Sequence, residues 1–338
     1  MNRPSRLPPH FSASAEFFLF AFDPAQDRAW VLHFDREDYR RASFLDQRAL
    51  HHRQIPGWEM PRAELEAALG RPASAPPVHW LFHIGHCGST LLSRILDLAP
   101  GVLGLREPLP LLALAQSGEG VAGWFEPTLR LLARGFDDTQ AVVVKPTSLV
   151  TTLAGPVLDR LPGQACLLWV DLQTWLATML RDAGLCENAL ASEPLRLAAL
   201  AEAGWPPAAG NGERLARLWL GEQLRWRQLA RDPDKARRLL DLDFATVLDD
   251  PAATSARLLA HFGLQAPPDW AQRITASGLL THYAKDGTQD FDAHTRRHEL
   301  DAAAAAHRDA IAGGMIWAER AITLLGAGEL TPRLRPRD

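Results

Sequence analysis

The sequence predicts an α/β protein built in three layers, with helices covering both faces of a mostly parallel sheet. Two observations lead to this prediction. Beyond residue 78, short apolar runs typical of buried strands alternate with longer stretches of helical periodicity. One of those runs ends in a glycine turn (85–90) that opens directly into a helix. Such alternation is typical of βαβ units wound into a single sheet.

Composition narrows the class of protein further. The chain has 338 residues, of which 47% are hydrophobic, enough for a large core. Its net charge of −4 gives neither the basic excess of a nucleic-acid partner nor an acidic tail. A local basic pocket for an anionic ligand is compatible with that balance.

Cysteine usage and the N-terminus suggest a cytoplasmic protein. The chain has three cysteines, Cys87, Cys166 and Cys186. This number is small and odd, so no disulfide framework is expected, and a reducing compartment fits. The apolar run 17–22 is short and flanked by acidic residues, so it suits neither a signal sequence nor a membrane span. We therefore expect no membrane partner.

The first 75 residues are expected to form an extension to the main domain. Tandem prolines in the segment 71–77 interrupt regular structure and indicate a linker. We therefore place an N-terminal extension of hairpin plus short helices at 1–75 and the main domain at 78–328. The elements expected in the extension are a β-hairpin (17–22 and 28–34), a helical stretch (36–53) and a short helix (62–69).

The main domain is expected to alternate strands and helices. The predicted strands are 79–84, 140–144, 165–170 and 238–243. The predicted helices are 89–98, 108–116, 122–134, 148–160, 172–183, 213–231, 252–262 and a last one near 299–325. The Gly/Pro/Ala-rich segment 184–212 is interpreted as a lid or an acceptor loop.

The turn after the first of these strands has the features of an anion site. We call it the glycine loop; its residues are Gly85, His86, Cys87, Gly88, Ser89 and Thr90. Where a strand ends in glycines and a helix begins, unpaired N–H groups and the helix dipole both favour an anion. The hydroxyls of Ser89 and Thr90 add donors or cap the helix. An ordinary βα turn with such a cap explains the same pattern.

The glycine loop lacks the lysine and the wider glycine spacing of nucleoside-triphosphate loops. That counts against an ATPase or GTPase that uses magnesium. The histidines show no metal-ligand spacing, so no metal site is predicted.

Three sequence blocks resemble the sulfotransferase superfamily in the same order, over roughly residues 79–265. The run 85–97 is similar to the 5′-phosphosulfate loop of bacterial and protein-tyrosine sulfotransferases. Glu107 follows His86 by 21 residues, the spacing at which protein-tyrosine sulfotransferases have their catalytic base. The blocks 142–147, which contains Lys145, and 240–264 resemble later family segments.

The resemblance implies a P-loop sulfotransferase fold and activity. It implies sulfuryl transfer from 3′-phosphoadenosine 5′-phosphosulfate (PAPS), a co-substrate, to a hydroxyl acceptor, with no permanently bound cofactor. In such a reaction, positioning of the reactants and stabilisation of the developing charge account for most of the rate enhancement. Glu107 is implied as the base, Lys145 as the partner of the bridging oxygen, and His86 as the basic residue of the loop that holds the 5′-phosphate.

Each of these residues also has a structural interpretation. Glu107 can favour a helix N-terminus or pair with Arg106. Lys145 ends a strand, where open α/β sheets bind ligands, which favours function. Cys87 can be a thiol nucleophile or, more simply, a small residue filling the loop. His83 on a strand is typical of a packed core histidine.

Two departures from the family pattern concern the donor. His86 stands where relatives have Arg or Lys, and it is charged only part of the time near neutral pH. Asp171 stands where relatives have an Arg for the 3′-phosphate, with Met179 at the place of a Ser. The residues that we expect to compensate are Thr178, Arg181, Lys285 and Arg296-Arg297.

Two other functions stay open at this point. One is a divergent P-loop transferase that uses another nucleotide. The other is a non-catalytic protein that binds a phosphorylated ligand or partner, which Asp171 and His86 favour. The N-terminal hairpin is expected to cover the sheet edge or to mediate a homodimer.

Overall fold

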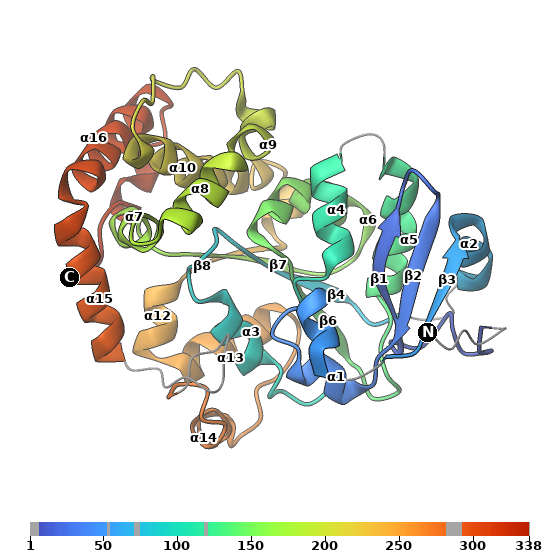
Figure 1. Cartoon of the computed structure of the whole chain (residues 1–338). Coiled ribbons are helices and arrows are strands. Elements are labelled where there is room, and N and C mark those ends of the chain that lie inside the picture. Colours follow the sequence, from blue (N-terminus) through green and yellow to red (C-terminus); the bar gives the residue numbers. More distant parts are fainter. Residues whose placement is uncertain (1–6, 53–54, 71–74, 118–120, 282–292, 338) are drawn as a thin grey trace.

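The computed structural model describes residues 7–52, 55–70, 75–117, 121–281 and 293–337, and it contains two sheets (Figure 1). The large sheet has five parallel strands in the order β5-β6-β4-β7-β8. Their bounds are β4 (Val78–His83), β5 (Val102–Arg106), β6 (Ala141–Lys145), β7 (Ala165–Trp169) and β8 (Leu239–Asp243). The small sheet is antiparallel, with β1 (Phe17–Asp23), β2 (Arg28–His33) and β3 (Gly57–Pro61).

Helices cover both faces of the large sheet, which confirms the predicted three-layer α/β fold. Below the sheet in Figure 1 lie α3 (Ser89–Leu96), α12 (Phe244–Asp249) and α13 (Pro251–His261). Above it lie α4 (Leu109–Ser117), α7 (Leu172–Leu180) and α10 (Asn211–Leu229). Every residue of β4 is buried, as expected of the central strand of a parallel sheet.

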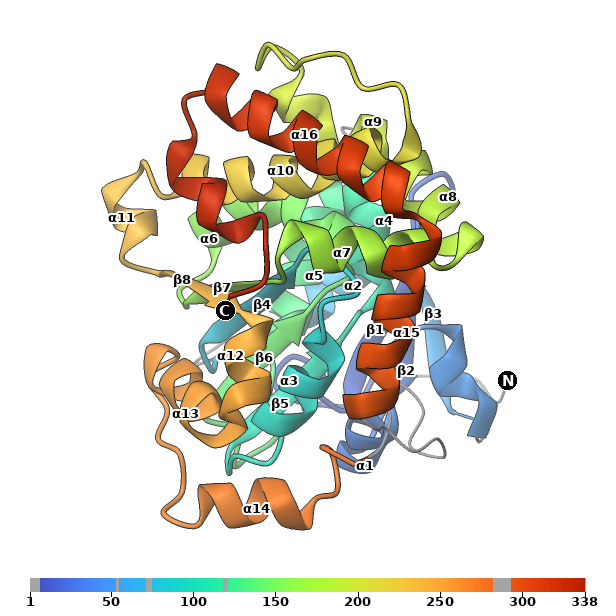
Figure 2. The ribbon, with the colours of Figure 1, turned by 90° about the vertical axis from the view of Figure 1, so that its left-hand side faces the viewer.

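The remaining helices form the edges of the molecule. The long helix α16 (Arg308–Leu324) packs along α10, and α15 (Ala293–Ala306) packs against α7 (Figure 2). The other elements are α1 (Arg36–Arg41), η1 (Gln47–His52), α2 (Arg62–Leu69), α5 (Ala122–Leu132), η3 (Ser148–Leu153), α6 (Ala154–Arg160), α8 (Ala183–Ala191), α9 (Glu193–Leu197), η4 (Ala198–Leu200), α11 (Pro233–Ala236), α14 (Trp270–Ala276) and η5 (Gly328–Arg333).

The strand β5 is absent from the elements predicted above. Its five residues are interrupted by Gly104, which weakens the apolar pattern of a strand. The structure gives the reason for that glycine: a Cβ at this position would overlap the Asp97 carboxylate. Asp97 is an ion-pair partner of Arg106, so the glycine makes room for a buried charge pair.

Three other expectations are corrected. The stretch 36–53 contains α1 and η1 with an irregular segment between them, rather than one helix. The segment 184–212 contains α8, α9 and η4 in addition to loop. The helix expected near 299–325 is divided into α15 and α16 at His307. The predicted hairpin is confirmed as β1 and β2, with β3 as an unforeseen third strand.

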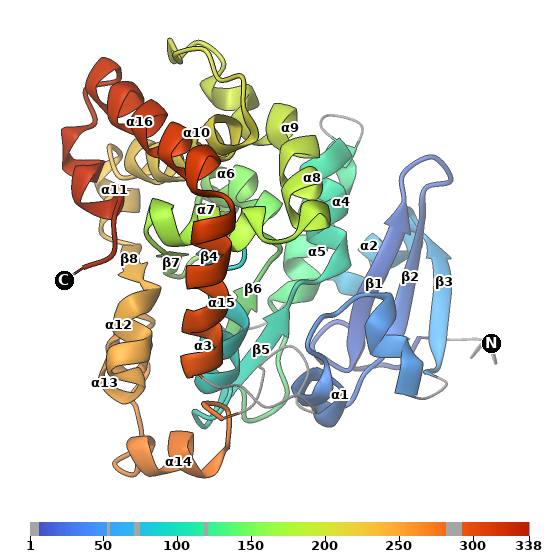
Figure 3. The ribbon, with the colours of Figure 1, turned by 60° about the vertical axis from the view of Figure 1, so that its left-hand side comes forward.

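The small sheet lies beside the large one, with α4 and α5 between them (Figure 3). Both parts share one continuous hydrophobic core. Two buried arginines, Arg106 and Arg134, join the two parts through hydrogen bonds to backbone carbonyls of the N-terminal residues. Arg134 donates to the carbonyls of Phe11 (2.5 Å), Leu131 (3.2 Å) and Phe17, and burial lowers its pKa to about 10. The boundary near residue 75 stays a prediction.

Replacing Arg134 by Met should therefore destabilise the protein by about 3 kcal/mol, because buried carbonyls would lose their donors. The free energy of unfolding from urea titration measures this. The matched control is Arg41→Met. Arg41 forms an exposed pair with Glu37, so its loss should cost less than about 0.5 kcal/mol. Equal effects of the two substitutions would contradict the role assigned to Arg134.

Candidate functional site

The glycine loop joins β4 to α3 through a run of left-handed backbone. Gly85, His86 and Gly88 have φ values of +88°, +54° and +82°. Glycine adopts this region without strain, whereas His86 is held in it at a cost. Gly88 is the N-cap of α3 and supplies no side-chain cap, so N–H groups of the first turn stay available to an anion. Ser89 and Thr90, in that turn, are buried.

His83 fixes the start of the loop. Its Nδ1 accepts the Gly85 N–H (3.1 Å) and its Nε2 lies 2.8 Å from the Pro146 carbonyl. The ring therefore carries its proton on Nε2 and links the loop after β4 to the loop after β6. Burial, reinforced by Lys145, holds the pKa of His83 well below its usual value, so the ring is neutral. On the other side of the loop, Trp175 Nε1 donates to the Gly85 carbonyl (2.9 Å).

Glu107 and Lys145 form an ion pair at the ends of neighbouring strands. The Glu107 N–H donates to the Lys145 carbonyl (2.6 Å), and Lys145 Nζ contacts Glu107 Oε1. The Lys145 side chain is 1% exposed and that of Glu107 is 16% exposed. Glu107 also has a positive φ of +52°. Arg106 pairs with Asp97 instead, so the pairing of Glu107 with Arg106 considered from the sequence does not occur.

The Cys87 side chain is directed toward β7. It is fully buried, and its Sγ donates to the Leu168 carbonyl at 3.4 Å. Burial raises the pKa of the thiol to about 12, so it is neutral at physiological pH. These features favour Cys87 as a small filler of the loop over Cys87 as a nucleophile.

Asp171, which replaces the expected arginine, is the N-cap of α7. Its carboxylate accepts the Thr174 N–H (2.8 Å), and burial raises its pKa. Arg181 lies at the other end of this helix and pairs with Glu299 of α15 (3.0 Å), so it does not meet Asp171. Thr178 donates back to the Thr174 carbonyl (2.9 Å). Lys285 and the Arg296 side chain lie outside the described residues.

The C-terminal segment brings basic residues to this end of α7. The Gln173 N–H donates to the Leu334 carbonyl (3.0 Å), which holds this segment against the first turn of α7. Arg333 pairs with Asp241 (2.6 Å), and Arg337 pairs with Asp243 (3.0 Å). The alternating arginines at 333, 335 and 337 were visible in the sequence, but nothing local indicated where they would lie.

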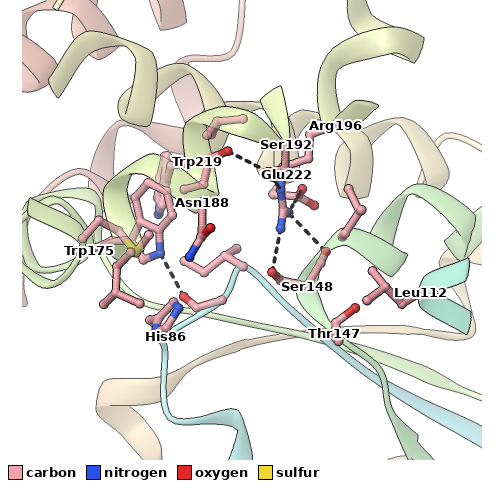
Figure 4. Close-up of a pocket in the computed structure, with 17 residues that line it drawn as sticks. His86, Leu112, Thr147, Ser148, Trp175, Asn188, Ser192, Arg196, Trp219 and Glu222 are labelled. Atoms are coloured by element: carbon pink, nitrogen blue, oxygen red, sulfur yellow. Dashed lines mark hydrogen bonds and ion pairs between the residues drawn. The ribbon is translucent and has the colours of Figure 1, made fainter. Parts of the chain in front are cut away.

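A cavity of about 240 Å³ opens behind the glycine loop (Figure 4). Gly85, His86, Thr147, Ser148 and residues of α7, α8 and α10 line it. Asn188 points into its centre (Figure 4). The predicted acceptor segment 184–212 thus contributes to its wall.

The charges on this cavity wall compensate one another. Arg196 donates to the Ser148 hydroxyl (2.6 Å), the Ser192 hydroxyl (2.9 Å) and Glu222 (2.9 Å). Burial alone would raise the pKa of Glu222, but Arg225 and Arg196 outweigh it, and the pKa is lowered. The cavity wall therefore combines apolar side chains with polar groups, and the two charged groups among these are paired with each other.

The chain is similar in structure to solved sulfotransferases. One is the sulfotransferase domain from the curacin biosynthetic pathway, at 12% identity, covering 70% of this chain and 99% of that one, with a TM-score of 0.39. Another, from Alicyclobacillus acidocaldarius, has 15% identity, 75% and 100% coverage and a TM-score of 0.37. A third, from Mycobacterium avium, has 13% identity, 72% and 81% coverage and a TM-score of 0.40.

No family model matches the sequence, and no curated protein matches it. With identities and TM-scores this low, function has to be derived from this chain's own residues. Within the described residues, no helix is long and apolar enough to cross a membrane, and no cluster of three or more His, Cys, Asp or Glu side chains suits a metal ion.

The neutral state of His83 predicts a loss of stability in mild acid. Burial lowers the folded-state pKa of both His83 and His79, the latter to about 4. Their contribution is complete above the unfolded value of about 6.5 and is lost as the pH falls below it. The free energy of unfolding should drop by up to about 1.4 kcal/mol per pH unit for each histidine.

Urea titrations between pH 7 and pH 5 measure this slope. His83→Gln should flatten it, whereas His298→Gln, at an exposed position on α15, should leave it unchanged. A slope that persists unchanged in His83→Gln would show that His83 is protonated as readily in the folded protein as in the unfolded chain.

Proposed function

We propose that this protein transfers a sulfuryl group from PAPS to a hydroxyl acceptor. The observation that carries the proposal is the Lys145–Glu107 ion pair at the carboxyl ends of β6 and β5, on the edge of the sheet where the glycine loop leaves β4. Open α/β sheets bind ligands at this edge. A cation, a carboxylate and free N–H groups at one edge are the parts that an anionic group transfer requires.

Each residue has one task in the proposed reaction. Glu107 accepts the proton of the acceptor hydroxyl, whose oxygen then forms a bond to sulfur. The bond between sulfur and the bridging oxygen of the 5′-phosphate breaks, and the electron pair stays on that oxygen. Lys145 stabilises this charge, while the N–H groups of the glycine loop and His86 hold the phosphosulfate. The products are 3′-phosphoadenosine 5′-phosphate (PAP) and a sulfate ester.

The 3′-phosphate is assigned to the C-terminal arginines. Arg337 pairs with Asp243, whose charge also raises the pKa of Asp171. A phosphate can replace a carboxylate as the partner of a guanidinium, because it forms bidentate hydrogen bonds with it. In this proposal Arg333 and Arg337 stand in for the arginine that Asp171 replaces. The sequence had suggested other residues for this role, namely Thr178, Arg181, Lys285 and Arg296-Arg297.

The acceptor is assigned to the cavity behind the glycine loop. An apolar cavity of about 150 Å³ holds a benzene-sized molecule, so a cavity of about 240 Å³ suits a small ring with substituents. Thr147 Oγ1 is buried with no hydrogen-bond partner among the described residues, and Asn188 points inward (Figure 4). These two groups suit the orientation of a hydroxyl. The compensated Arg196–Glu222 pair favours an uncharged acceptor.

A second candidate function is binding of a phosphorylated ligand that has no 3′-phosphate. The carboxylates of Asp171 and Asp243 at the ends of β7 and β8 favour it, since they would repel an additional phosphate. For either function we propose a cytoplasmic location, supported by three cysteines that are all free thiols.

Calorimetry should find that PAP binds more tightly than ATP, GTP or adenosine 5′-phosphosulfate. At about a hundred times its dissociation constant, PAP should add roughly 2.7 kcal/mol of stability. Arg337→Met should weaken binding of PAP and leave binding of adenosine 5′-phosphosulfate unchanged. Arg335→Met is the matched control, because Arg335 pairs with Glu319 of α16 and not with a carboxylate at the end of β8. Preference for another nucleotide would favour the second function.

Glu107→Gln should retain PAP affinity and lose turnover by about 10² to 10⁴, the contribution of a general base. Glutamine keeps the size of the side chain but accepts no proton. Sulfate-ester formation from PAPS, followed with a panel of small alcohols and phenols, measures the rate. Glu126→Gln, exposed on α5, serves as the control. Unchanged turnover in Glu107→Gln would remove Glu107 from the role of base.

A further inference from the structure

Segment 42–48 consists of the irregular residues between α1 and η1 and the first two residues of η1, and it lies against the carboxyl end of β5. The Leu45 N–H donates to the Arg106 carbonyl (2.7 Å), and the Leu109 N–H donates to the Leu45 carbonyl (3.3 Å). These two hydrogen bonds attach the segment to the chain on either side of Glu107. A part of the N-terminal extension is therefore in place around the candidate base.

Side chains of the main domain hold the same segment. Arg106 Nε donates to the Ala42 carbonyl (2.8 Å), and Arg94 of α3 donates to the Ser43 hydroxyl (2.7 Å). Arg106 is 1% exposed, so this contact is deep in the protein. The segment is thus fixed both by β5 and by the helix that follows the glycine loop.

Phe44 connects this segment to Lys145. Lys145 Nζ lies over the Phe44 ring at 5.6 Å from its centroid. The Arg48 guanidinium lies over the same ring at 3.6 Å, and Asp46 holds Arg48 through Nε (2.9 Å). Both distances are within the range in which an aromatic face attracts a cation. Phe44 is therefore held in place by Arg48 while it meets the buried ammonium.

We propose that Phe44 is a positioning residue for Lys145 and that segment 42–48 forms one wall of the catalytic site. An aromatic face stabilises an ammonium without offering it a hydrogen-bond acceptor. The ring thus gives the ammonium of Lys145, which is 1% exposed, a favourable neighbour, and its N–H groups stay directed toward Glu107 and the incoming ligand. The inference rests on the proposed function only in the role that Lys145 plays there.

The reactivity of the Lys145 amine tests this without any assay of turnover. The chain has three lysines, Lys145, Lys235 and Lys285, so peptide mapping after trace labelling with acetic anhydride follows each one separately. Phe44→Leu keeps an apolar side chain but removes the aromatic face. Labelling of Lys145 relative to Lys235 should rise by about 10-fold, because the charged form loses its partner.

Three further variants make the test specific. Phe44→Trp retains an aromatic face and should label like the parent. Arg48→Met removes a side chain that is 56% exposed, and it should release the Phe44 ring and raise Lys145 labelling part of the way. Phe136→Leu is the matched control. It removes another arginine–aromatic contact of the extension, Arg36 over Phe136 at 4.6 Å, which does not touch Lys145.

The outcomes separate this inference from the proposed function. Parent-like labelling in Phe44→Leu, labelling in Phe44→Trp as high as in Phe44→Leu, or an equal rise in Phe136→Leu would each overturn the role of Phe44. If labelling responds as expected and the parent transfers sulfuryl groups, Phe44→Leu should lower kcat and leave PAP affinity unchanged. If labelling responds but the parent transfers none, Phe44 still positions Lys145 and the proposed function fails.

Discussion

The burial of β4 on both faces is the constraint on which the rest of the structure depends. β4 pairs in parallel with β6 and β7, and a parallel sheet of this kind needs helices on both of its faces to cover its apolar side chains. Since all five strands are parallel, their carboxyl ends meet at one edge. The glycine loop, Glu107, Lys145, Asp171 and Asp243 lie along this edge although they are spread over much of the sequence.

Backbone strain is concentrated at the same edge. Three non-glycine residues among those described have positive φ, and two of them are His86 and Glu107. Neither is β-branched, but each is held in a conformation that costs free energy. The hydrogen bonds around them provide the compensation: His83 and Trp175 hold Gly85, and Lys145 and Leu45 hold the chain at Glu107. Strain retained in this way is typical of functional sites.

The sequence was most informative where one local pattern determines the outcome. A short apolar run followed by glycines predicted β4, the glycine loop and α3, and the resemblance to sulfotransferases placed Glu107 and Lys145 in one site. It was least informative where a contact with a residue far away in the sequence determines the structure or the role of a residue. β5 was missed because Gly104 interrupts its apolar pattern, and this glycine is needed to leave space for the Asp97 carboxylate. The roles proposed for Phe44 and Arg337 depend on contacts with residues far away in the sequence. No short pattern encodes such contacts.

The charges along the edge are paired before any ligand arrives. Glu107 is paired with Lys145, Asp241 with Arg333 and Asp243 with Arg337. Buried charges need such compensation, since an unpaired one would cost several kcal/mol. A multiply charged anion that binds these cations has to take them from their carboxylates. In the reaction proposed above, this exchange releases Glu107 from Lys145 when the donor binds, so the proposed base becomes available in the same step that brings Lys145 to the leaving oxygen.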